Sequence, residues 1–199
     1  MNGEFTPVTI TVDGQEQTKY VASKSCTSSE STYTCREGAR GYILNEPQLD
    51  LDSPNYFSPN LLGSSIEWDI DLSDFGCGCF NTFYTVSMPG KTSDGSLDQS
   101  DGYFYCDANA VGGVLCPEID FMEANKYAFQ TTAHSCGPPS DKGHYTECDG
   151  SSPAHKNSVV ELGSNGYGPG NQYTIDTTKE FHVKISLAEA DGSFSGILT

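Results

Sequence analysis

Residues 65–72 read Ser65-Ile66-Glu67-Trp68-Asp69-Ile70-Asp71-Leu72. Apolar and acidic side chains alternate along this stretch, and a period of two is typical of a β-strand with one buried face. We expect the face that carries Trp68 to point into a core and the acidic face to point to solvent. Residues 181–187 alternate in the same way, which places His182 on a polar surface.

Short runs of β-branched and aromatic residues recur on both sides of this stretch, separated by clusters of Gly, Pro, Ser and Asp. The pattern predicts strands at residues 7–12, 18–22, 40–45, 64–71, 81–88, 102–106, 115–123, 127–133, 157–162, 172–176, 181–188 and 193–198. No long segment has a helical period, so we expect an all-β sandwich. A chain of 199 residues is the size of one such domain, spanning residues 1–199.

The charge of the chain excludes two classes of partner. It contains 27 acidic residues against 10 Lys and Arg, a formal net charge of −17. Such a field repels phosphate backbones and anionic lipid surfaces, so nucleic acids and membranes are not expected as partners. No stretch approaches the roughly 20 apolar residues that span a bilayer. A neutral polysaccharide is not repelled.

Eight cysteines are scattered through loop-rich sequence, at positions 26, 35, 77, 79, 106, 116, 136 and 148. An even number in this setting predicts disulfides and therefore a secreted, extracellular protein. Sequence alone does not choose among the roughly one hundred possible pairings. The only close cluster is Cys77-Gly78-Cys79, and no second pair follows at zinc-ligand spacing, so no metal site is expected.

Three acids fall on one predicted strand, within Cys116-Pro117-Glu118-Ile119-Asp120-Phe121-Met122-Glu123-Ala124-Asn125. Glu118 and Asp120 are two residues apart and therefore share a face, whereas strict alternation would place Glu123 on the other face. A β-bulge between Asp120 and Glu123 would insert one extra residue and bring all three acids onto one face. We expect such a bulge.

Acids gathered in this way are suited to the hydrolysis of glycosidic bonds. Glycosidases whose two carboxyl groups lie about 5–5.5 Å apart cleave the glycosidic bond with retention of anomeric configuration. Repulsion among three neighbouring acids should raise the pKa of at least one of them and prepare it as a proton donor. The alternatives are a calcium site, although calcium prefers loop ligands with carbonyls and water, and an acidic strand that simply faces solvent.

The segment Glu118–Asn125 resembles the catalytic strand of glycoside hydrolase family 7, the cellobiohydrolases and endoglucanases, in which Glu-x-Asp-x-x-Glu is followed by Ala-Asn. The resemblance extends from about residue 40 to about residue 190. It includes Leu62–Ser73, Cys77-Gly78, Tyr84–Met88, Tyr105-Cys106-Asp107, Thr132–Cys136, Tyr167–Gly170 and Asp176–Lys179, in the order of the family.

The resemblance implies a concanavalin-like jelly roll of two curved antiparallel sheets whose concave face binds a β-1,4-glucan. It implies that Glu118 is the nucleophile, that Glu123 is the general acid and base, and that Asp120 orients and tunes Glu118. His134, Tyr84 and Asp107 match family positions that bind substrate. No metal or organic cofactor is implied.

Two departures from the family lead to a competing interpretation. Family members are roughly twice as long, so we expect either a fragment or a sheet completed by another chain. The family lines its sugar sites with several tryptophans, and this chain has only Trp68. The alternative is therefore an extracellular structural or glycan-binding subunit that self-associates through an unfinished sheet. A laminarinase-type enzyme shares the acid spacing, but Ala124-Asn125, Cys77-Gly78 and the segment at Tyr167 fit it poorly.

Overall fold

The computed structural model describes residues 4–23, 25–29, 32–100, 102–149 and 165–198. By its internal contacts the chain divides into an N-terminal unit, Met1–Pro59, and a C-terminal unit, Asn60–Thr199. The expectation of one domain over residues 1–199 stays a prediction. Among the described residues, no helix is long and apolar enough to cross a membrane.

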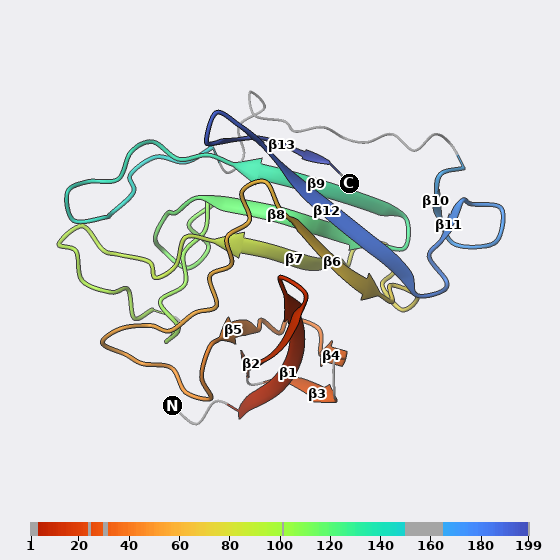
Figure 1. Ribbon diagram of the computed structural model, residues 1–199, viewed down its shortest axis with the longest axis horizontal. Helices are drawn as coiled ribbons and strands as arrows, with labels where there is room; N and C mark the ends of the chain where they lie inside the picture. Colours follow the sequence, from red (N-terminus) through yellow and green to blue (C-terminus); the bar gives the residue numbers. More distant parts are fainter. Residues whose placement is uncertain (1–3, 24, 30–31, 101, 150–164, 199) are drawn as a thin grey trace. The chain divides into compact units, whose positions relative to one another are not determined.

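The N-terminal unit consists of a three-stranded antiparallel sheet and a short hairpin (Figure 1). The sheet has the order β1 (Glu4–Val12), β2 (Gln15–Ser23) and β5 (Tyr42–Leu44), and the hairpin joins β3 (Cys26–Ser29) to β4 (Thr32–Cys35). Asp13 and Gly14 link β1 to β2 with φ angles of 51° and 76°. This two-residue Asp-Gly loop has the positive φ angles that tight hairpin turns require.

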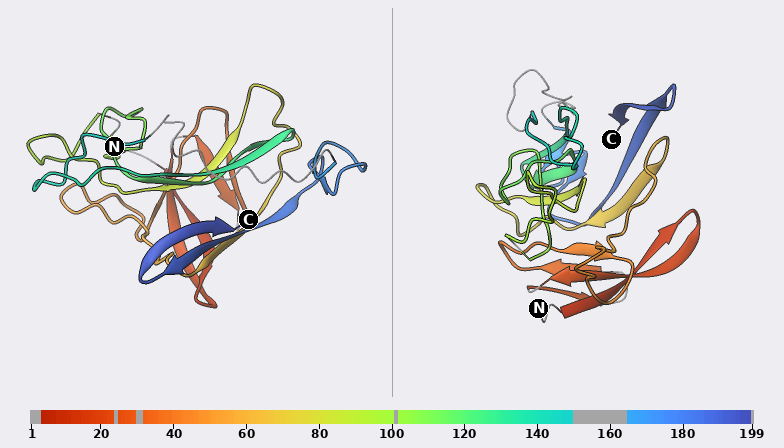
Figure 2. Two further views of the ribbon diagram at one scale, coloured as in Figure 1. Left: turned by 90° about the horizontal axis from the view of Figure 1, so that it is seen from above. Right: turned by 90° about the vertical axis from the view of Figure 1, so that its left-hand side faces the viewer.

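The C-terminal unit contains two three-stranded antiparallel sheets (Figure 1). One sheet has the order β7 (Asn81–Val86), β8 (Glu118–Asn125) and β9 (Ala128–His134). The other has the order β13 (Ser193–Leu198), β12 (Phe181–Ala190) and β6 (Ser65–Ile70). The short parallel strands β10 (Tyr167–Gly168) and β11 (Ile175–Asp176) form a separate ladder. Figure 2 shows the two larger sheets as separate layers.

The core of this unit lies between those two sheets. Phe121 of β8 packs in one cluster with Val183, Ile185 and Leu187 of β12. Trp68 of β6 packs against the same cluster, and its ring lies 4.8 Å from that of Phe83. Facing sheets with an apolar interior form a β-sandwich, which confirms the predicted fold class.

The two alternating stretches take up the predicted orientation. Trp68 points into the core, whereas Glu67 and Asp69 are exposed. His182 is 55% exposed and contacts Asp69 through Nδ1 at 2.9 Å. The single tryptophan therefore packs between the sheets and does not lie on a polar surface.

Most predicted strands are present, with ends that differ by a few residues. The prediction was wrong for 102–106, which forms no strand: Phe104 has a φ of 54°, incompatible with extended backbone, and is buried in a loop. Only Ile175–Asp176 of the predicted 172–176 pairs. The prediction for 157–162 lies outside the described residues. The hairpin β3–β4 was not predicted because its sequence is rich in Ser and Thr without apolar alternation.

Six of the eight cysteines form disulfides, Cys26–Cys35, Cys106–Cys116 and Cys136–Cys148. Cys77 and Cys79 are free and exposed, so the predicted disulfides do not include these two. Each disulfide closes a short loop, with partners 9, 10 or 12 residues apart.

Candidate active site

A β-bulge interrupts the regular pairing of β8. Tyr84 of β7 pairs with Asp120, but the preceding residue Phe83 pairs with Met122, so β8 contains one extra residue. The consecutive side chains of Phe121 and Met122 are both fully buried. The strand therefore changes its inside–outside parity at this point, as predicted.

The bulge brings the three acids of β8 onto one face of the sheet, opposite the core. Neighbouring strands add polar side chains to the same face, since directly paired residues point to the same side. On β9, His134 pairs with Glu118, Thr132 with Asp120 and Gln130 with Glu123. One side of β7–β8–β9 thus contributes to the core while the other forms a polar surface.

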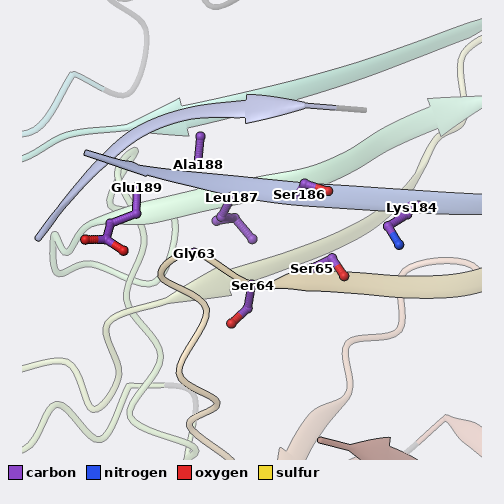
Figure 3. Close-up of a pocket in the computed structure, with 8 residues that line it drawn as sticks. All are labelled: Gly63, Ser64, Ser65, Lys184, Ser186, Leu187, Ala188 and Glu189. Atoms are coloured by element: carbon purple, nitrogen blue, oxygen red, sulfur yellow. The ribbon is translucent and has the colours of Figure 1, made fainter. Parts of the chain in front are cut away.

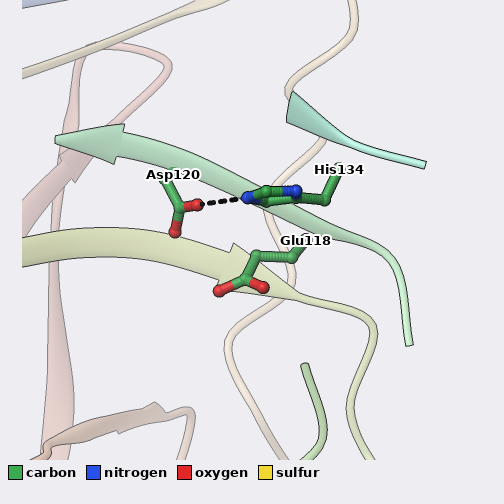
Figure 4. A group of neighbouring side chains, drawn as sticks. All are labelled: Glu118, Asp120 and His134. Atoms are coloured by element: carbon green, nitrogen blue, oxygen red, sulfur yellow. Dashed lines mark ion pairs between the residues drawn. The ribbon is translucent and has the colours of Figure 1, made fainter. Parts of the chain in front are cut away.

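Glu118, Asp120 and His134 form the centre of this surface (Figure 4). His134 Nε2 lies 3.2 Å from Asp120 Oδ2. One carboxylate oxygen of each acid and one ring nitrogen of His134 all lie within 4.8 Å of one another. The backbone N–H of Ala108 donates a hydrogen bond to Glu118 Oε2 at 3.0 Å. These three atoms are of the kinds that bind a metal ion, but the contacts of the side chains with one another already explain why they lie together.

Burial controls the protonation of the two adjacent acids. Burial, together with the negative charges of Glu118 and Glu123, raises the pKa of Asp120 to about 8. Burial also raises the pKa of Glu118, opposed by the hydrogen bond from Ala108. Asp120 therefore holds a proton at neutral pH and donates a hydrogen bond to Glu118. The expected rise in pKa is found at Glu118 and Asp120, but burial contributes more to it than repulsion between the acids.

Asp120→Asn is expected to flatten the pH dependence of stability. Since the pKa of Asp120 is raised to about 8 in the folded protein, the folded state binds more protons than the unfolded state between about pH 4 and pH 8. Its contribution to the free energy of unfolding therefore falls by about 1.4 kcal/mol per pH unit as pH rises through this window. Urea unfolding followed by Trp68 fluorescence at pH 5 and pH 7.5 measures the difference.

The control for this measurement is Asp141→Asn, which removes a carboxylate from an exposed loop of the same unit. The free energy of unfolding should change with pH by the same amount in the wild type and in this control, and by a smaller amount in Asp120→Asn. Equal slopes in all three proteins would contradict a raised pKa at Asp120.

Glu123, the third acid, is half-buried and contacts β9. Gln130 Nε2 and Thr132 Oγ1 each donate a hydrogen bond to Glu123 Oε2 at 3.4 Å, and Gln130 Nε2 also donates to Thr132 Oγ1 at 2.9 Å. Sequence reasoning missed Gln130 and Thr132. The signal was the alternation of residues 128–134, which would have placed both on the face of the acids once β8 and β9 were paired.

Tyr84 and Asp107 occupy different surroundings. Tyr84 lies on the face of the acids, opposite Asp120, and its hydroxyl donates a hydrogen bond to the hydroxyl of Tyr105 at 3.3 Å. Asp107 is 2% exposed, and its Oδ1 accepts hydrogen bonds from the backbone N–H groups of Asn109 at 2.8 Å and Val111 at 3.0 Å. Asp107 thus caps its own loop, and its negative charge raises the pKa of Glu118. A contact of either residue with sugar stays a prediction.

A shallow hollow lies on the other sheet, where β12 passes the start of β6 (Figure 3). It is lined by Gly63, Ser64, Ser65, Lys184, Ser186, Leu187, Ala188 and Glu189. None of these residues belongs to the acidic surface of β8, so the hollow is separate from the candidate site.

Comparison with known proteins confirms the resemblance to glycoside hydrolase family 7. A probable endo-β-1,4-glucanase of Aspergillus clavatus is 30% identical over 194 aligned residues, which cover 85% of this chain and 44% of the relative. An endoglucanase of Trichoderma longibrachiatum is 31% identical over 199 aligned residues, covering 89% and 41%. A family 7 cellobiohydrolase of Daphnia pulex superposes with a TM-score of 0.68 at 17% identity, covering 96% of this chain and 66% of the other. No protein-family model matches the chain.

The chain spans less than half the length of these curated relatives, 44% and 41%. An endoglucanase I solved in complex with cellobiose superposes with a TM-score of 0.65 at 18% identity, covering 96% of this chain and 67% of the other. At such identities the superpositions establish the shared fold.

Proposed function

We propose that this protein hydrolyses β-1,4-glucan, a cellulose-type polysaccharide, with retention of anomeric configuration. The observation that carries the proposal is the bulge of β8, which brings Glu118, Asp120 and Glu123 onto one polar face. Bulges that re-aim a side chain are over-represented next to active sites, which supports a catalytic role for this strand. The descriptions of the relatives as endo-β-1,4-glucanase and endoglucanase support the choice of substrate.

In the proposed mechanism, ionised Glu118 attacks the anomeric carbon and forms a glycosyl ester. Protonated Glu123 gives its proton to the departing glycosidic oxygen, and then, as a base, activates the water that releases the sugar. Asp120 keeps the proton that the two buried acids would otherwise share, because its pKa is raised to about 8. Its hydrogen bond orients Glu118 and leaves the nucleophile ionised. The mechanism uses no metal or organic cofactor.

The surroundings of the acids supply the proposed substrate contacts. His134 and Tyr84 lie on the same face as the acids, and we propose that they border the bound sugar. Asp107 would act on the substrate through the loop that it caps. We propose an extracellular location, which the three disulfides support since such bonds persist in oxidising compartments. The net charge of −17 favours a neutral polymer over nucleic acid or membrane.

The test is hydrolysis of a soluble β-1,4-glucan and of an aryl β-cellobioside, with the anomer of the first-formed product read by NMR. We expect turnover with the β-anomer formed first, as retention requires. Formation of the α-anomer first would contradict a Glu nucleophile. A folded protein without turnover would contradict the proposal and support the alternative, a structural or glycan-binding subunit. Binding of the glucan would then distinguish a glycan-binding role from a structural one.

A further inference from the structure

The loop that follows β9 returns to the candidate site. The backbone N–H of Asp149 donates a hydrogen bond to the carbonyl of Ser135 at 3.0 Å, directly beside the end of β9. The next residues, Cys136 and Cys148, pair in an isolated antiparallel β-bridge and are also joined by a disulfide. Asp149 is thereby held next to His134, although the two are distant in sequence.

The side chain of Asp149 contacts the second nitrogen of the histidine ring. His134 Nδ1 lies 3.3 Å from Asp149 Oδ1, while Nε2 lies 3.2 Å from Asp120 Oδ2. The side chains of His134 and Asp149 are only 13% and 8% exposed. The hydroxyl of Ser135 donates a hydrogen bond to Asp149 Oδ2 at 3.0 Å, which fixes the second carboxylate oxygen. Both ring nitrogens thus face carboxylates, and the ring has little freedom to rotate.

We propose that Asp149 is a positioning residue for the proposed hydrolysis, acting through His134 on Asp120 and Glu118. An aspartate that accepts a hydrogen bond from one imidazole nitrogen fixes both the tautomer and the plane of the ring. Here the contact of Asp149 Oδ1 with Nδ1 at 3.3 Å would favour a proton on Nδ1 and direct Nε2 toward Asp120. The Nε2 lone pair then faces Asp120 Oδ2 and competes with Glu118 for the single proton of Asp120.

This inference rests on the proposed function for its kinetic part, and its geometric part stands alone. A purely structural Asp149 would anchor the loop without affecting the chemistry. The two roles differ in their consequences, because loss of an anchor lowers stability or substrate affinity, whereas loss of ring orientation lowers kcat at unchanged KM.

The kinetic experiment uses the full chain and three variants, Asp149→Ala, Asp149→Asn and the control Glu147→Gln. Asp149→Ala is expected to lower kcat for an aryl β-cellobioside by about 10- to 100-fold, the range expected for one charge-assisted hydrogen bond, with KM unchanged. Asp149→Asn should recover most of this loss, because the amide oxygen still accepts a hydrogen bond from Nδ1. Glu147 is exposed in the same loop, and its variant should match wild type.

A second measurement does not depend on activity. The ¹⁵N chemical shifts of the His134 ring should show a proton on Nδ1 in the wild type and in Asp149→Asn, and a mixture of tautomers in Asp149→Ala. If the wild type hydrolyses no glucan, the proposed function fails while these shifts still test the positioning. The inference is overturned if the ring shifts of Asp149→Ala match wild type, if kcat is unchanged, or if Asp149→Asn loses as much activity as Asp149→Ala. Should Asp149→Ala fail to fold, Asp149→Asn is compared with wild type by the same two measurements. A proton on Nδ1 and most of the wild-type kcat are expected, and loss of either would overturn the inference.

Discussion

Glu118→Gln is expected to lower the rate of β-glucan hydrolysis by about 10⁴- to 10⁶-fold, the effect of removing a catalytic nucleophile. Glutamine has nearly the same shape and can still accept the hydrogen bond of Ala108, but its uncharged amide cannot form the glycosyl ester. The loss should therefore appear in kcat with the fold intact. Initial rates with an aryl β-cellobioside measure the loss of kcat, and the urea midpoint of each protein measures whether the fold is intact.

The matched control is Glu67→Gln, which removes an exposed acid from β6, a strand of the other sheet. It should retain wild-type activity. A second pair of variants separates the roles of the two catalytic acids. With azide as an added nucleophile, Glu118→Ala should give a product of inverted configuration, because azide replaces the missing carboxylate, and Glu123→Ala should give a product of retained configuration. The opposite assignment of products would exchange the roles of Glu118 and Glu123.

Phe121→Ala is expected to lower the free energy of unfolding of the C-terminal unit by about 3–5 kcal/mol, the usual cost of truncating a buried aromatic residue. Phe121 is fully buried and packs against β12, and its ring lies 5.9 Å from that of Phe83. It also occupies the bulge, so the cavity would form directly behind the acids. Urea unfolding followed by Trp68 fluorescence reports on this unit, which contains the only tryptophan.

Phe80→Ala serves as the control for this experiment. Phe80 is 62% exposed, so the same truncation there should change stability by less than about 0.5 kcal/mol. If the two variants unfolded at the same urea concentration, Phe121 could not be part of a tightly packed core.

The sequence allowed prediction of those parts of the fold in which each strand has one apolar and one polar face. Residues 65–72 and 181–187 show this alternation clearly, and both strands turn the predicted face to the core. The prediction failed at 102–106, where Tyr103, Phe104 and Tyr105 have the composition of a strand. Their burial comes from loop packing beside the Cys106–Cys116 disulfide, and no local pattern distinguishes the two cases.

The candidate site was predictable to the extent that its residues share a strand. The bulge was inferred from the spacing of the acids, because only an extra residue restores their common face. Asp149 was not found, since its position depends on a disulfide pairing that sequence could not choose. Gln130 and Thr132 required the register between β8 and β9, which is a tertiary property.

The extra residue in β8 also determines which sequence changes this segment can tolerate. Substitutions at Phe121 or Met122 alter packing and leave the acids where they are. Deletion of a single residue between Asp120 and Glu123 would remove the bulge and leave a two-residue spacing, so strict alternation would keep Glu123 on the face of Asp120 but bring it about 3.3 Å closer along the strand. In evolutionary terms, loss of this one residue would preserve the common face of the acids and change their separation, the distance on which the stereochemical course of glycoside hydrolysis depends.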